Sequence, residues 1–61
     1  MMQETEIYDY ARQLFDARGT KAIAEAAQKA HAYEEQGDVE MARTWRAIQR
    51  ALIVAGGPSA S

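Results

Sequence analysis

Hydrophobic positions in the first part of the chain recur at the spacing of one helix face. They are Ile7, Tyr10, Ala11, Leu14 and Phe15, with Asp9, Arg12, Gln13 and Asp16 on the opposite side. Intervals of three and four residues are typical of an amphipathic helix. This pattern predicts a helix over residues 4–18.

The middle of the chain is rich in alanine, which has the highest helix propensity and fills little volume. The predicted inner face carries Ile23, Ala27 and Ala30, flanked by Ala26 and Tyr33. We expect a helix over residues 21–36 that its neighbours approach closely.

A third apolar stripe predicts a helix over residues 39–55. It contains Met41, Trp45, Ile48 and Leu52, whereas Arg43, Arg46 and Arg50 fall on the far side. The place of Trp45 within the stripe favours a core position. The alternative is an exposed ring on which a base or another ring stacks.

Two glycine–polar doublets, Gly19-Thr20 and Gly37-Asp38, separate the predicted helices. Glycine readily adopts the left-handed conformation that ends a helix, and Thr or Asp caps the next one with its side-chain oxygen. Turns this short place consecutive helices antiparallel. We therefore predict an all-α, three-helix up-down-up bundle in a single domain over residues 1–56, followed by a disordered tail over residues 57–61.

The predicted core is thin for three helices. Its ten large side chains are Ile7, Tyr10, Leu14, Phe15, Ile23, Tyr33, Met41, Trp45, Ile48 and Leu52. A chain of 61 residues buries about 60% of the surface that its unfolded form exposes, so proteins of this size often need a disulfide, a metal or a partner. Without cysteine, disulfides are excluded. The thin core therefore favours homodimerisation or binding to a partner over a solitary monomer.

Composition narrows the class of protein further. Seven Lys and Arg against nine Asp and Glu give a formal charge of −2, which argues against a dedicated nucleic-acid binder. The apolar run over residues 51–55 is too short to span a bilayer, and the acidic N-terminus is unlike a signal peptide. The absence of cysteine also fits a reducing compartment, so we expect a cytoplasmic protein.

The residues offer little catalytic chemistry. His31 and Glu35 are four residues apart and could act as a general base and the carboxylate that orients it. No cysteine or glycine-flanked serine nucleophile accompanies them, so a solvated surface pair is the favoured interpretation. We expect no enzymatic activity, no cofactor and no metal site.

Residues 30–42 read A-H-A-Y-E-E-Q-G-D-V-E-M-A. Ala30, Tyr33, Gly37-Asp38 and Ala42 resemble the middle of a tetratricopeptide repeat, in which small residues let two antiparallel helices touch and an aromatic residue packs across them. The resemblance implies a helical hairpin and assigns no binding residue. As a whole, the chain resembles short helical proteins found in bacteria.

The strongest candidate for function is the outer face of the third predicted helix. Arg43, Arg46 and Arg50 are the only charged residues in positions 41–55, and arginine suits bidentate contact with carboxylate or phosphate. Ile53 and Val54 lie nearby, away from the core stripe, where a homodimer contact is the simplest explanation. For the three arginines, a solvated face partly neutralised by Glu40 is the favoured interpretation, and a binding surface is the alternative.

Two functions remain open on these grounds. The first is a small non-enzymatic interaction module that self-associates and binds a protein through its third helix. The second is a nucleic-acid-associated regulator whose three arginines contact phosphates or bases.

Overall fold

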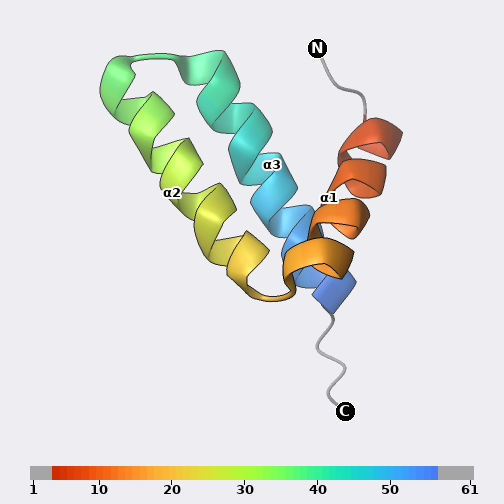
Figure 1. Cartoon of the computed structure of the whole chain (residues 1–61). Coiled ribbons are helices and arrows are strands. Elements are labelled where there is room, and N and C mark those ends of the chain that lie inside the picture. Colours follow the sequence, from red (N-terminus) through yellow and green to blue (C-terminus); the bar gives the residue numbers. More distant parts are fainter. Residues whose placement is uncertain (1–3, 57–61) are drawn as a thin grey trace.

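Two glycines in the left-handed conformation direct the path of the chain. The computed structural model describes residues 4–56 (Figure 1), and Gly19 and Gly37 have φ of 64° and 80°. At Gly37 the backbone N–H donates to the carbonyl of Glu34 at 3.1 Å, and the N–H of Asp38 donates to that of Tyr33 at 2.9 Å. These two bonds form a Schellman motif, which ends the second helix.

The helices between these turns follow the predicted ranges. They are α1 (Glu4–Arg18), α2 (Lys21–Gln36) and α3 (Val39–Gly56). Helix α2 runs antiparallel to both of the others (Figure 1). The predicted all-α, three-helix up-down-up bundle is therefore confirmed, with α3 ending one residue later than expected. The predicted tail over residues 57–61 lies outside the described residues.

The two helix starts differ in how they are capped. Asp38 Oδ1 accepts a hydrogen bond from the backbone N–H of Met41 at 3.2 Å, which confirms the predicted cap of α3. The matching prediction for Thr20 is wrong, because its side chain makes no capping hydrogen bond. With φ of −67° and ψ of −17°, Thr20 already has helical dihedral angles, whereas a capping residue normally adopts extended ones.

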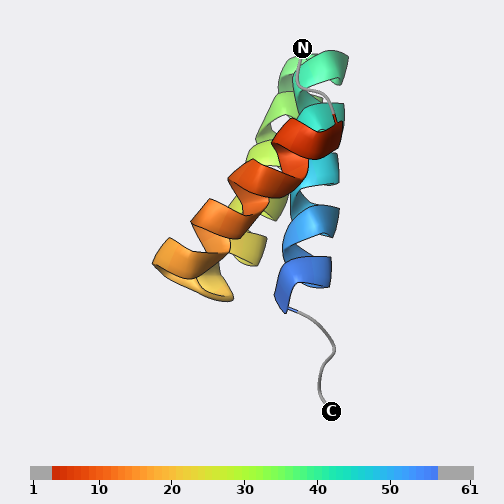
Figure 2. The ribbon, with the colours of Figure 1, turned by 90° about the vertical axis from the view of Figure 1, so that its right-hand side faces the viewer.

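Helix α3 is the centre of the packing. Both α1 and α2 pack extensively against it, but they contact each other little. From the turn at residues 19–20, α1 and α2 diverge like the arms of a V (Figure 1), and α1 lies obliquely across α3 (Figure 2). The N-terminal halves of α1 and α3 are consequently left partly uncovered on one side.

The core consists mainly of alanines around two larger side chains. Ile48 and Leu52 are buried to 1% and 0% exposure. The buried alanines are Ala11, Ala22, Ala26, Ala30, Ala42 and Ala51. On α2 the buried stripe repeats every four residues. Ala30 belongs to it as predicted, whereas Ile23 and Ala27 are only partly buried and Ala26, predicted at the flank, is fully buried. Alanine at these positions allows close approach of the helices, as the sequence indicates.

Tyr10 and Met41 are not in the core, contrary to prediction. Their exposed fractions are 39% and 37%, because the diverging arms of the V leave no helix to cover them. The remaining large side chains of the predicted core are partly buried; they are Ile7, Leu14, Phe15, Ile23, Tyr33 and Trp45.

The two capping residues provide a matched stability test. Asp38→Ala removes a capping hydrogen bond and should lower the free energy of unfolding by about 1 kcal/mol, or roughly 4–8 °C in Tm. Thr20→Ala removes none and should change it by less than about 0.5 kcal/mol. Thermal unfolding followed by circular dichroism measures both. Equal losses would contradict the assigned difference between the two caps.

Candidate functional site

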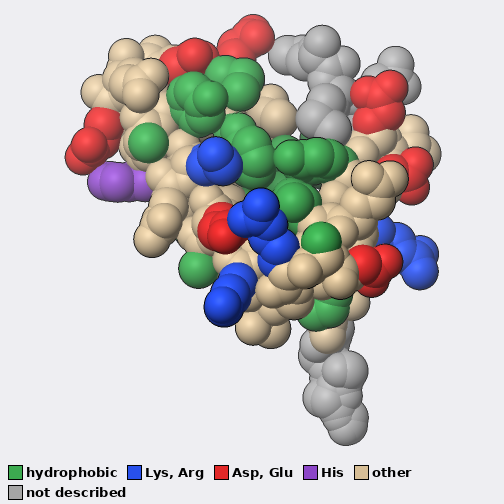
Figure 3. Space-filling view, in the orientation of Figure 1, with side chains coloured by type: hydrophobic (Ala, Val, Ile, Leu, Met, Phe, Trp, Pro, Cys, Tyr) green, Lys and Arg blue, Asp and Glu red, His purple; other side chains and the backbone are tan. Residues whose placement is uncertain are grey.

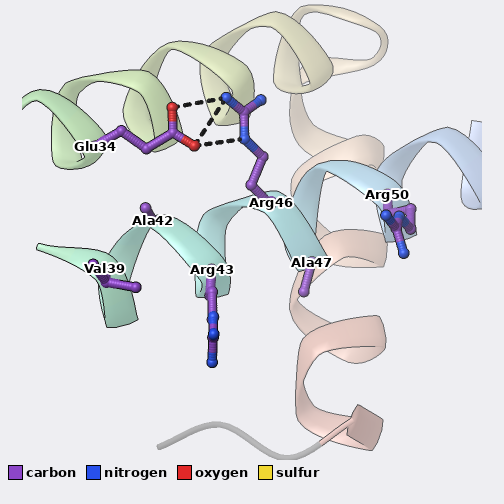
Figure 4. A pocket seen from close by; sticks show the side chains of 7 residues that line it. All are labelled: Glu34, Val39, Ala42, Arg43, Arg46, Ala47 and Arg50. Carbon is purple, nitrogen blue, oxygen red and sulfur yellow. Dashed lines mark hydrogen bonds and ion pairs between the residues drawn. The ribbon is translucent and has the colours of Figure 1, made fainter.

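The three arginines of α3 lie along one surface hollow. Because Ile48 and Leu52 face the core, residues on the opposite side of α3 point outward. The hollow, about 480 Å³ in volume, is lined by Arg43, Arg46 and Arg50 together with Glu34, Val39, Ala42 and Ala47 (Figure 4). The structure therefore brings the predicted arginines together on one surface.

Arg46 is held by the neighbouring helix. Its Nη2 donates to Glu34 Oε1 at 3.1 Å, and its Nε donates to Glu34 Oε2 at 3.3 Å. A further bond runs from Nη1 to Gln49 Oε1 at 3.3 Å. Arg46 thus links α3 to α2 through a bidentate ion pair (Figure 4), a role that the sequence reading missed. Twelve residues and the hairpin turn separate the partners, so no local spacing indicates the pair.

Arg43 and Arg50 have no such partner. Within residues 4–56, no carboxylate forms an ion pair with either guanidinium. Both side chains are exposed, and Arg43 points away from α2 (Figure 4). These two positive charges are therefore free to meet an external ligand.

The two apolar candidates lie on different sides of α3. Ile53, 50% exposed, lines a smaller hollow with Arg46, Gln49 and Arg50. Val54, 60% exposed, lines a hollow beside α1 instead. Ile53 thus extends the surface that carries the arginines, and Val54 borders it.

At the opposite end of this surface lies Val39, which the sequence reading did not single out. It is 60% exposed and lines the same hollow as the arginines. Positions 39, 43, 46, 50 and 53 are separated by alternating steps of four and three residues, as in a coiled-coil seam. This spacing could have indicated Val39. We call this surface the arginine face; its members are Val39, Arg43, Arg46, Ala47, Arg50 and Ile53.

Other candidate chemistry lies on the surface or is absent from the described residues. His31 Nε2 and Glu35 Oε2 are 3.1 Å apart, with side chains 66% and 70% exposed. Among residues 4–56, no cluster of three His, Asp or Glu side chains could hold a metal ion. No helix in this range has both the length and the apolarity required to cross a membrane.

Comparison with known proteins does not assign a function. No protein-family model matches the chain, and no significant match is found among curated proteins or solved structures.

A double-mutant cycle measures what the Arg46–Glu34 pair contributes. Glu34→Gln and Arg46→Gln should show a coupling of about 0.2–1 kcal/mol in the free energy of unfolding, because both side chains are about half exposed. High salt should weaken this coupling. The control cycle combines Glu34→Gln with Arg50→Gln, which lines the same hollow without bonding Glu34, and should show almost none. Equal coupling in both cycles would contradict the assignment of Arg46 to a structural link.

Proposed function

We propose that this protein is a small non-enzymatic interaction module that self-associates and binds an acidic segment of another protein through the arginine face. The observation that supports this most strongly is the pair of unpaired guanidinium groups, Arg43 and Arg50, beside exposed Val39 and Ile53. Charged groups flanking exposed apolar side chains are typical of a surface that recognises a protein helix.

The proposed ligand follows from the spacing of the arginines. Arg43 and Arg50 are seven residues apart, or about 10.5 Å along the helix axis. The small side chain of Ala47 lies between them along the hollow, so a second helix can approach closely there. A helix with two carboxylates seven residues apart and a leucine between them matches this surface in charge and shape.

A protein ligand fits better than nucleic acid. The carboxylate of Glu34 lines the hollow and already neutralises Arg46, which leaves two unpaired arginines in it. A phosphate backbone would meet that carboxylate and a chain of net charge −2. High-affinity contact with a phosphate backbone normally uses more cations than this.

Self-association is supported by the balance between buried and exposed apolar side chains. Among the described residues, Ile48 and Leu52 are the large side chains that are fully buried. Six large hydrophobic residues are exposed instead: Tyr8, Tyr10, Val39, Met41, Ile53 and Val54. Exposed apolar surface of this extent on so small a protein favours a protein partner or a second copy.

A designed helical peptide with two glutamates seven residues apart tests the arginine face. Binding measured by isothermal titration calorimetry should be weakened about tenfold by Arg43→Glu combined with Arg50→Glu, because attraction becomes repulsion. The control Arg12→Glu reverses an exposed charge on α1 and should leave the affinity almost unchanged.

The same experiment separates the alternatives. A peptide with the glutamates replaced by lysines should not bind. Equal binding by the wild type and the double variant would overturn the role of the arginine face. Binding of a short DNA or RNA duplex at low salt that Arg43→Glu abolishes, without binding of the acidic peptide, would favour the nucleic-acid function instead.

A further inference from the structure

A second surface lies on the other side of α3, where α1 and α2 diverge. We call it the aromatic groove. It has a volume of about 620 Å³ and is lined by Tyr10, Met41, Thr44, Trp45 and Ile48, with Glu6 and Glu40 also in its lining. Hydrophobic side chains gather in this region across the upper middle of Figure 3. The groove contains both side chains that were predicted in the core and are exposed, Tyr10 and Met41.

The aromatic rings of the groove are already ordered within one molecule. Tyr10 and Trp45 meet edge to face, with ring centroids 6.3 Å apart and planes at 71°. Lys29 Nζ, from α2, lies 5.4 Å from the centroid of the Trp45 ring. Partly exposed rings in a defined arrangement can be covered at little cost in side-chain entropy.

Opposite charges lie towards the two ends of this apolar surface. Glu40 precedes Met41 at the start of α3, whereas Lys29 lies over Trp45, five residues or about 7.5 Å further along the axis. The order along the surface is thus carboxylate, apolar side chains, ammonium. A surface with this order is complementary to its own copy after a half-turn rotation.

We propose that a second copy of the chain docks on the aromatic groove in a two-fold dimer. In a two-fold interface the same patch faces itself in reversed orientation. The apolar side chains around Met41 and Trp45 then cover those of the partner, and Lys29 of each copy approaches Glu40 of the other. This proposal rests on the proposed self-association and assigns it to a surface separate from the arginine face.

Charge explains why the groove, and not the arginine face, is the self-association surface. The arginine face presents Arg43 and Arg50 of one sign, so two copies laid against each other there would repel. The charged residues that line the aromatic groove are the carboxylates Glu6 and Glu40, and the ammonium of Lys29 lies outside this lining, over the Trp45 ring. The groove together with its Trp45 edge therefore presents both signs. A dimer formed through the groove also leaves Ile53 and both unpaired arginines accessible, although Ile53 and Val54 are the homodimer contact that the sequence alone favours.

Sedimentation equilibrium of the full chain tests the interface. Met41→Glu should raise the dimer dissociation constant at least about tenfold, because a carboxylate would be buried against an apolar surface and near Glu40. Ile53→Asp is the matched control, since it places a carboxylate on the exposed opposite face, and should leave the constant unchanged. Circular dichroism of each variant monitors folding.

Exchanging the charges of Lys29 and Glu40 distinguishes a lost contact between the two copies from a loss of folding. Lys29→Glu and Glu40→Lys should each weaken the dimer, and the double variant should recover the wild-type constant, since both copies then carry the exchanged signs. A mere loss of the Lys29–Trp45 contact would not be recovered in this way. The chain has one tryptophan, so the emission of Trp45 should shift to shorter wavelength with concentration as the partner covers its ring.

Each contrary result of these experiments would overturn a different part of the proposal. A wild-type chain that is monomeric at all concentrations overturns self-association, and this interface with it, while leaving the acidic-peptide result intact. A dimer that is insensitive to Met41→Glu and is disrupted by Ile53→Asp would overturn the groove as the dimer interface but would leave self-association intact. Failure of the double charge exchange to restore the dimer overturns the two-fold arrangement.

Discussion

The packing of Ile48 and Leu52 against the alanines of α1 and α2 is the interaction on which the rest of the structure depends. These two α3 side chains share one cluster with Ala11, Ala22 and Ala26. A large side chain opposite a small one lets the helix axes come close and removes apolar surface from water. The largest fully buried side chains therefore lie on one helix, and α1 and α2 are held together mainly through their contacts with it.

Because α1 and α2 pack mainly on α3 and little on each other, part of the α3 surface stays uncovered. A helix with neighbours on two sides keeps part of its surface free, and here α1 and α2 diverge from their turn instead of closing around it (Figure 1). Ion pairs link the elements at the margins: Arg18 with Glu25 at 2.7 Å joins α1 to α2, and Arg46 with Glu34 joins α2 to α3. Such half-exposed pairs contribute less than apolar burial does, so they refine the arrangement that the alanine contacts determine.

The sequence predicts the helices well and their lateral packing poorly. Helix ranges follow from apolar periodicity and from the left-handed glycines, which are local properties. Tyr10 and Met41 belong to correct apolar stripes, yet periodicity identifies only the inward side of a helix and not whether a neighbour covers it. Thr20 fails as a cap because the cap depends on the dihedral angles of the turn, which residue type alone does not determine.

The candidate site shows the same division between local and long-range information. Arg43, Arg46 and Arg50 lie on one face, as helical spacing requires. Only the folded hairpin shows that Arg46 already forms an ion pair with Glu34. Val39 and Ile53 join the arginines because the outer side of α3 is left uncovered. A prediction from sequence could find the face, but it could not say which of its charges are already paired.

The two open surfaces of α3 differ in a way that separates their roles. The arginine face carries unpaired charge of one sign, so it is complementary to something acidic and not to itself. The aromatic groove has carboxylates in its lining and the Lys29 ammonium beside Trp45, and in the proposed dimer it faces its own copy. Because the surfaces lie on opposite sides of one helix, the proposed dimer would display two arginine faces pointing away from each other. A partner whose two acidic segments are joined by a linker long enough to reach around the dimer would then bind both faces at once and gain affinity, without any contact beyond those at each face.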